Sequence, residues 1–151
     1  MLLANATTHN HDPVGITSHT TKGHIARATL EATCYQTKAI LDAMEKDSGG
    51  TRLGSLAVDG GMSDSEYCMQ FQADVSGIRV VRPAMRETTC LGAAYAAGLA
   101  VGFWTNTEDL RANWRRAAEW TPNMAADVRD REYKSWLKAV ERTMGWIEDE
   151  N

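Results

Sequence analysis

The chain has 151 residues, of which 43% are hydrophobic and 24% are charged, the size and composition of one globular domain with a buried core. A formal net charge of −4 and a pI near 5.5 argue against binding to nucleic acid or to anionic lipid. No segment approaches the roughly 18 consecutive apolar residues of a membrane span, so we expect no membrane insertion.

The N-terminal residues 1–11 are polar and aperiodic, and we expect them to form a disordered tail. They lack the basic and apolar regions of a secretory signal. The three cysteines, Cys34, Cys68 and Cys90, are far apart and have apolar or small neighbours, so we expect buried free thiols. These features favour a cytoplasmic location.

A long helix is predicted to begin after Thr20 or Thr21, either of which can cap it, and to end at the Ser48-Gly49-Gly50 segment. Residues 55–58 then form a short apolar run with the length of a buried strand. The apolar side of the helix is expected to consist of Ile25, Ala28, Ala32, Ala39, Ile40, Ala43 and Met44.

A second helix is predicted directly after the turn that follows this strand. Ser63 and Glu66 form an S-x-x-E capping box at its start, and Gly77 is expected to end it. Residues 78–81 then predict a second strand, which Pro83 stops.

A third helix is predicted over residues 87–101. Its segment 92–98 consists almost entirely of small residues, which typically let another part of the fold approach the helix closely. Thr107 is expected to cap a short helix with acidic residues in its first turn. A last helix from about residue 127 has an apolar side made of Tyr133, Trp136, Val140, Met144 and Ile147.

The alternating order of helix, strand, helix, strand and helix predicts an α/β domain with a parallel sheet, followed by C-terminal helices. Two strands do not make a stable sheet, because a sheet needs neighbours on its edges and cover on its faces. The sequence therefore indicates that the complete fold contains further strands.

The candidate binding site is the junction at which the first strand meets Asp59-Gly60-Gly61 and the second helix. The glycines allow a sharp turn without a Cβ clash, and the following helix start presents N–H groups and a partial positive charge suited to a phosphate. Such a turn is more often structural than ligand-binding, and it matches neither the P-loop nor the G-x-G-x-x-G pattern. Asp59 itself is expected to brace the turn rather than to act as a base.

Longer blocks resemble the FGGY family of carbohydrate kinases and, within it, the glycerol kinases. The resemblance extends from about Asp12 to Glu150, so residues 12–151 are identified as the C-terminal part of an FGGY kinase nucleotide-binding domain. The blocks that carry it are Gly15-Ile16 with residues 24–31 (HIARATLE), 58–62 (VDGGM), 69–74 (MQFQAD), 87–94 (ETTCLGAA), 98–104 (GLAVGFW), 136–140 (WLKAV) and 144–146 (MGW).

The resemblance implies part of a ribonuclease-H-like, actin-like ATPase domain that binds ATP or ADP, with Mg²⁺ in the complete enzyme. It implies nucleotide contacts at Gly60, Gly61, Met62 and Ser65. The Gly61 backbone contact transfers most directly, because the family usually has asparagine where this chain has Ser65. The implied parent activity is ATP-dependent phosphorylation of glycerol to glycerol 3-phosphate.

The resemblance assigns no catalytic residue and no metal ligand to this chain. The family's catalytic aspartate, glycerol-binding residues and first phosphate-binding turns belong to upstream parts of the kinase. Phosphoryl transfer needs these groups together, so we expect the isolated chain to be inactive.

Two other interpretations stay open at this point. One is a non-catalytic interaction module that pairs with the missing kinase half or with a second copy of itself, suggested by unpaired strand edges and by the small-residue helix. The other is a related kinase for a different polyol, because the residues that would select the substrate are not in this chain.

Overall fold

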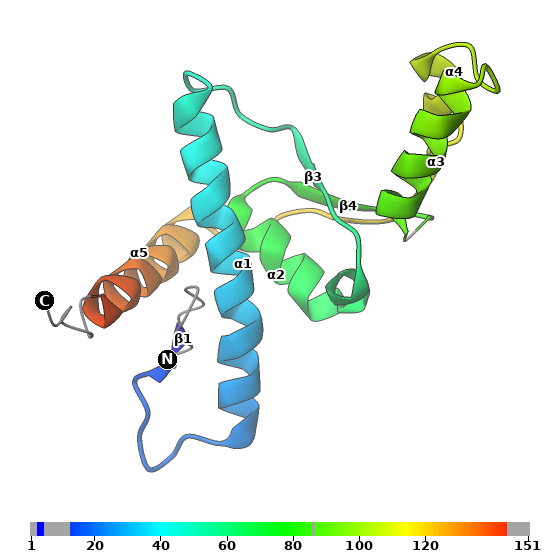
Figure 1. Cartoon of the computed structure of the whole chain (residues 1–151). Helices are drawn as coiled ribbons and strands as arrows, with labels where there is room; N and C mark the ends of the chain where they lie inside the picture. The colour runs from blue at the N-terminus through cyan, green and yellow to red at the C-terminus, as the bar shows by residue number, and fades with distance from the viewer. Residues whose placement is uncertain (1–2, 5–12, 86, 145–151) are drawn as a thin grey trace, which may run out of the picture.

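A computed structural model describes residues 3–4, 13–85 and 87–144 of the chain (Figure 1). The predicted α/β fold and the order of the main helices and strands are confirmed. The elements are β1 (Leu3–Ala4), β2 (Pro13–Val14), α1 (Lys22–Asp47), β3 (Ser55–Ala57), the 3₁₀ helix η1 (Gly61–Asp64), α2 (Glu66–Ser76), β4 (Arg79–Pro83), α3 (Thr88–Ala100), α4 (Thr107–Arg111), β5 (Arg116–Trp120) and α5 (Ala126–Thr143).

The N-terminal strands β1 and β2 pair antiparallel, with Leu3 opposite Val14. The rest of the tail that we expected to be disordered, residues 1–2 and 5–11, lies outside the described residues, and that expectation stays a prediction. Ile147, expected on the last helix, also lies outside them. None of the helices in the described ranges is both long and apolar enough to cross a membrane.

The larger sheet is mixed, so the prediction of a parallel sheet is only partly right. Strand β3 pairs parallel with β4, with Leu56 opposite Val80, whereas β4 pairs antiparallel with β5, with Val80 opposite Trp120. Strand β5 was not predicted, because its sequence Arg-Ala-Ala-Glu-Trp contains no β-branched residue. The order β3-β4-β5 leaves β3 with no partner on its outer side among the described residues.

Helix α1 begins as predicted. The Thr21 side chain accepts a hydrogen bond from the His24 amide, and the His24 imidazole accepts one from the Thr21 amide, which satisfies two donors at the helix start. The helix ends at Ser48, also as predicted. For the short helix α4 the prediction is wrong by one residue, because Asn106 is the cap and its Oδ1 accepts from the amides of Glu108 and Asp109.

The predicted apolar side of α1 is buried only in part. Ala28 and Ala32 are buried, whereas Ile25, Ile40 and Met44 are each about half exposed. Helices α2 and α5 and strand β1 all contact α1, and its buried positions lie between residues 28 and 35. Besides the two alanines, they are Glu31, Cys34 and Tyr35.

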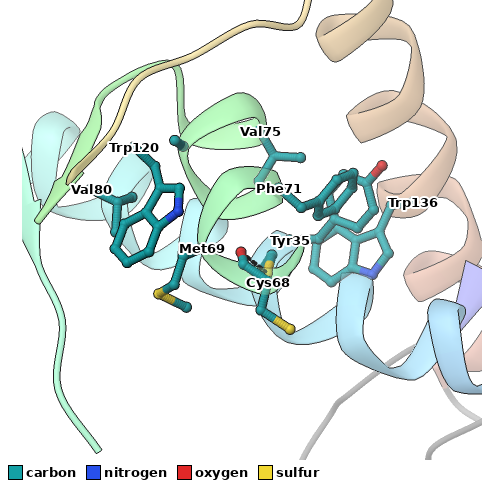
Figure 2. Close-up of a cluster of buried hydrophobic side chains, with 10 residues drawn as sticks. Tyr35, Cys68, Met69, Phe71, Val75, Val80, Trp120 and Trp136 are labelled. Carbon is teal, nitrogen blue, oxygen red and sulfur yellow. Dashed lines mark hydrogen bonds between the residues drawn. The ribbon is translucent and has the colours of Figure 1, made fainter. Parts of the chain in front are cut away.

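The core lies where α1, α2, α5 and the β4–β5 pair meet (Figure 2). Tyr35 of α1 meets Phe71 of α2 edge to face at 5.4 Å and stacks on Trp136 of α5 at 5.6 Å between ring centroids. At the other end of the cluster, Trp120 of β5 lies beside Val80 and Met69. Buried aromatic rings dominate the energetics of small cores, so this cluster joins the helices to the sheet.

Helix α3 behaves differently. Although the structure describes all of its residues, none of them is buried, and Figure 1 shows α3 and α4 standing apart from the other helices. Within this region a Cβ at Gly98 would overlap the indole ring of Trp104, so the glycine does permit a close approach there. The expectation of three buried thiols is correct for Cys34 and Cys68 and wrong for Cys90, which is exposed on α3.

Candidate functional site

The candidate turn begins where β3 leaves the sheet. Val58 still donates its N–H to the Val81 carbonyl at 3.0 Å, and the chain then reverses at Gly60. Gly60 has a φ of 80°, a conformation that strains residues with a Cβ, so glycine is required at this position. The 3₁₀ helix η1 follows, closed by a hydrogen bond of 3.1 Å from the Ser63 amide to the Gly60 carbonyl.

The predicted capping box is wrong, because η1 takes up residues 61–64 and α2 begins two residues later than expected. Ser63 is buried and its hydroxyl donates to the Gly60 carbonyl at 2.6 Å. Ser65 is the true cap of α2, since its Oγ accepts from the Cys68 amide at 3.3 Å. The Glu66 carboxylate accepts a hydrogen bond from the Trp120 indole instead of returning to the cap. The predicted end of α2 at Gly77 is confirmed.

The four predicted contact residues lie within this turn and at the cap of α2. Gly60 and Gly61 are exposed, Met62 is 47% exposed, and Ser65 is half-buried. A Cβ placed at Gly61 would meet nothing within 4 Å, and Gly61 has no positive φ. The backbone at Gly61 therefore faces open space that a flat or anionic ligand can approach, and its lack of a side chain is not explained by packing within the chain.

Neighbouring side chains brace the turn from two directions. The Asp59 carboxylate accepts a hydrogen bond from the Thr88 hydroxyl at the start of α3, in agreement with a bracing role for Asp59. Arg82 of β4 donates to the Ser63 carbonyl and pairs with Asp64. Sequence analysis did not identify Arg82. The available signal was a second arginine in a short strand that ends at Pro83.

The described residues contain no group of three or more His, Cys, Asp or Glu side chains arranged to hold a metal ion. A separate apolar groove of about 640 Å³ lies between the end of β4 and helices α3 and α4, with Leu91, Tyr95 and Trp114 among its lining residues. It adjoins the exposed helix α3 and not the glycine turn.

Comparison with known proteins agrees with this fold. Residues 4–101 match the model of the FGGY family of carbohydrate kinases, C-terminal domain. The chain is 73% identical over 136 residues to glycerol kinase 1 of Streptomyces avermitilis and 58% identical over 135 residues to the glycerol kinase of Chloroflexus aggregans. These alignments cover 90% and 89% of the chain, and 26% and 27% of the two relatives.

Among solved structures, the chain is similar to Plasmodium falciparum glycerol kinase with ADP, with a TM-score of 0.79 and 34% identity. That alignment covers 91% of this chain and 27% of the kinase. The chain belongs to the FGGY family of carbohydrate kinases. It spans about a quarter of the length of the curated relatives that it matches.

Proposed function

We propose that this chain forms one wall of an ATP or ADP site, and that the complete kinase to which it corresponds phosphorylates glycerol to glycerol 3-phosphate. The observation that carries the proposal is the 73% identity to a glycerol kinase across 90% of the chain. The exposed glycine turn before α2 supports it, because such a turn presents backbone N–H groups to a nucleotide. ATP would supply the transferred phosphoryl group.

The residues of the turn fit a nucleotide in three ways. At Gly61 the open space beside the backbone accepts a ribose or a phosphate, since no side chain occupies it. The exposed Met62 thioether is a soft apolar surface for a flat base. The Ser65 hydroxyl accepts from the Cys68 amide and retains its proton for donation to the ligand. Mg²⁺ and the catalytic base would be held by residues outside this chain.

The rest of the kinase is the partner that we propose. The outer side of β3 and the exposed helix α3 are the surfaces that upstream parts of an FGGY kinase would cover. The alternative of a non-catalytic module is not favoured, because the identity to glycerol kinases extends over 90% of the chain. We place the complete protein in the cytoplasm, where Cys34, Cys68 and Cys90 would remain free thiols.

An activity assay tests whether the chain needs the rest of the kinase for catalysis. With glycerol and Mg-ATP, we expect the 151-residue chain alone to release no ADP above a boiled control, because the catalytic base and the first phosphate-binding turns are supplied from elsewhere. Glycerol-dependent turnover that disappears when the chain is removed by immunodepletion would contradict this.

A binding assay tests the turn itself. We expect the chain to bind ADP with a Kd on the order of millimolar, since one wall of a cleft supplies few contacts against the cost of association. Gly61→Val should weaken binding without lowering the melting temperature, because position 61 is neither strained nor packed. If Gly61→Val leaves ADP binding unchanged, the proposed contact is wrong.

Position 65 supplies a matched pair of variants. Ser65→Ala removes the cap of α2 and should cost about 0.5–2 kcal/mol of stability together with one nucleotide contact. Ser65→Asn keeps a good cap and adds an amide that can bond to an adenine edge. We expect tighter ADP binding for Ser65→Asn than for the wild-type chain, and weaker binding for Ser65→Ala.

A further inference from the structure

Arg82 connects the glycine turn to the sheet. It lies near the end of β4, and its side chain is only 16% exposed. Its Nη1 donates to the Ser63 carbonyl oxygen at 2.5 Å and lies 3.2 Å from the Asp64 carboxylate. Because both acceptors belong to η1, one guanidinium group holds the main chain and a side chain of the turn.

The same guanidinium lies over Trp120 of β5, with 5.5 Å between Cζ and the ring centroid. Trp120 is buried, and its Nε1–H donates to the Glu66 carboxylate at 2.8 Å. Glu66 is in the first turn of α2. Arg82 and Trp120 thus tie both η1 and the start of α2 to the β4–β5 pair.

We propose that Arg82 is a positioning residue for nucleotide binding: it fixes the backbone of η1 against the sheet and so sets the affinity of the turn without touching the nucleotide. Hydrogen bonds from a guanidinium are roughly twice as strong as those between neutral groups, so a single side chain can hold the turn. The ion pair also offsets the charge of Asp64, which would otherwise repel an anionic ligand beside the turn. This inference rests on the proposed nucleotide site.

The test compares two arginines of the same strand in the 151-residue chain. Arg82→Met keeps an unbranched stem over Trp120 but removes the donors. Arg79→Met is the control, because Arg79 is 54% exposed and faces Glu119 at 3.6 Å, away from the turn. Amide hydrogen exchange is followed at Ser63 and Ser65, whose N–H groups donate to the Gly60 and Met62 carbonyls at 3.1 Å each. ADP binding is measured by NMR titration of the same samples.

For Arg82→Met we expect exchange at these two amides to rise about tenfold relative to amides in α1 and α5, and ADP binding to weaken about fivefold, as the charge-assisted bonds are lost. Arg79→Met should change neither quantity by more than about twofold. Arg82→Lys keeps one charged donor, so it should restore part of the amide protection and part of the ADP affinity. A merely destabilising change would instead raise exchange across α1 and α5 as well.

Two results would overturn the inference. One is unchanged exchange at Ser63 and Ser65 in Arg82→Met, and the other is faster exchange at both amides with unchanged ADP affinity. If the wild-type chain does not bind ADP at a concentration about ten times the expected millimolar Kd, the proposed nucleotide site is contradicted instead. The exchange measurement needs no nucleotide, so it separates a failure of Arg82 to hold the turn from a failure of the site.

Discussion

The helices α1, α2 and α5 are less apolar in sequence than helix α3, yet they contain buried residues and α3, which the structure describes in full, contains none. In the first group, Tyr35, Phe71 and Trp136 pack on one another and each is less than a tenth exposed. We call residues 87–115 the arm. In the arm, Val101 and Phe103 are more than three-quarters exposed, and none of the described α3 residues is buried. Helices α1, α2 and α5 contain buried residues because they pack on one another, whereas the described part of the chain provides α3 with no comparable packing partner.

The glycine turn lies at the border between these two regions. Arg82 and Trp120 connect it to the packed side, and the Asp59–Thr88 hydrogen bond connects it to the start of α3. Under the proposed function, the rest of the kinase would cover the arm and so fix the turn from both directions. The isolated chain fixes it mainly through β4 and β5, which is a physical reason to expect only weak nucleotide binding.

The largest expected difference between the regions is in stability. Trp136→Ala should cost about 3–5 kcal/mol, because it removes the ring that stacks on Tyr35. Trp114→Ala in the arm should change stability by no more than about 0.5 kcal/mol, since that ring is 55% exposed. Urea unfolding of both variants decides this. Similar losses for the two tryptophans would show that the arm belongs to the same cooperative unit as the core.

Association should depend on the arm and on the edge of β3, and not on the core. We expect the chain to self-associate at micromolar to millimolar concentrations, because the apolar side of α3 and the outer edge of β3 have no cover among the described residues. Replacing Val101 and Phe103 together by serine should reduce the associated fraction in sedimentation velocity. Ile40→Ser is the control, at an apolar position of α1 that is 57% exposed. An equal reduction of the associated fraction in the arm variant and in Ile40→Ser would mean that association does not depend on the arm in particular.

Within the arm, Gly98 and Gly92 should respond differently to alanine. A Cβ at Gly98 would displace the Trp104 ring, whereas a Cβ at Gly92 meets nothing within 4 Å. Gly98→Ala should therefore shift the Trp104 indole N–H resonance, and Gly92→Ala should leave it in place while gaining up to about 1 kcal/mol in helix propensity. An unshifted Trp104 signal in Gly98→Ala would show that the ring does not rest on α3.

The smallest expected effect is on thiol chemistry. In the native chain Cys90 should react with a disulfide reagent, whereas Cys34 and Cys68 should react only after denaturation. Burial raises the pKa of the Cys34 thiol from 9.0 to about 12, so that thiol stays protonated at neutral pH. Cys90→Ser should abolish the native reaction. Rapid labelling of this variant would mean that the core opens easily.

The raised pKa of Cys34 also predicts a pH effect on stability. Between about pH 9 and 12 the unfolded chain loses this proton while the folded chain keeps it, so the free energy of unfolding should fall as the pH rises through that window. Below pH 9 this contribution is fully present. Urea midpoints of the wild-type chain and of Cys34→Ala between pH 8 and 11 test this, because the variant should lose less stability with rising pH.

The order of the main helices and of strands β3 and β4, the cap at Thr21 and the end of α2 at Gly77 could all be predicted from the sequence. Each depends on residues within about one helical turn, such as a hydroxyl that accepts from a nearby amide or a glycine that adopts a left-handed conformation. The family could be recognised in the same way, because long blocks of contiguous residues carry it. The position of the candidate turn followed from a strand, two glycines and a helix in succession.

Burial, sheet partners and the support of the turn were decided only by the tertiary structure. Strand β5 has weak intrinsic preference for a strand and exists because β4 offers it an edge. Ser63 does not cap α2, because its hydroxyl bonds to the Gly60 carbonyl in a 3₁₀ helix that local spacing did not reveal. Arg82 reaches that turn from 19 residues farther along the chain, and Cys90 is exposed on α3, none of whose described residues is buried. All of these depend on long-range neighbours, which local patterns do not specify.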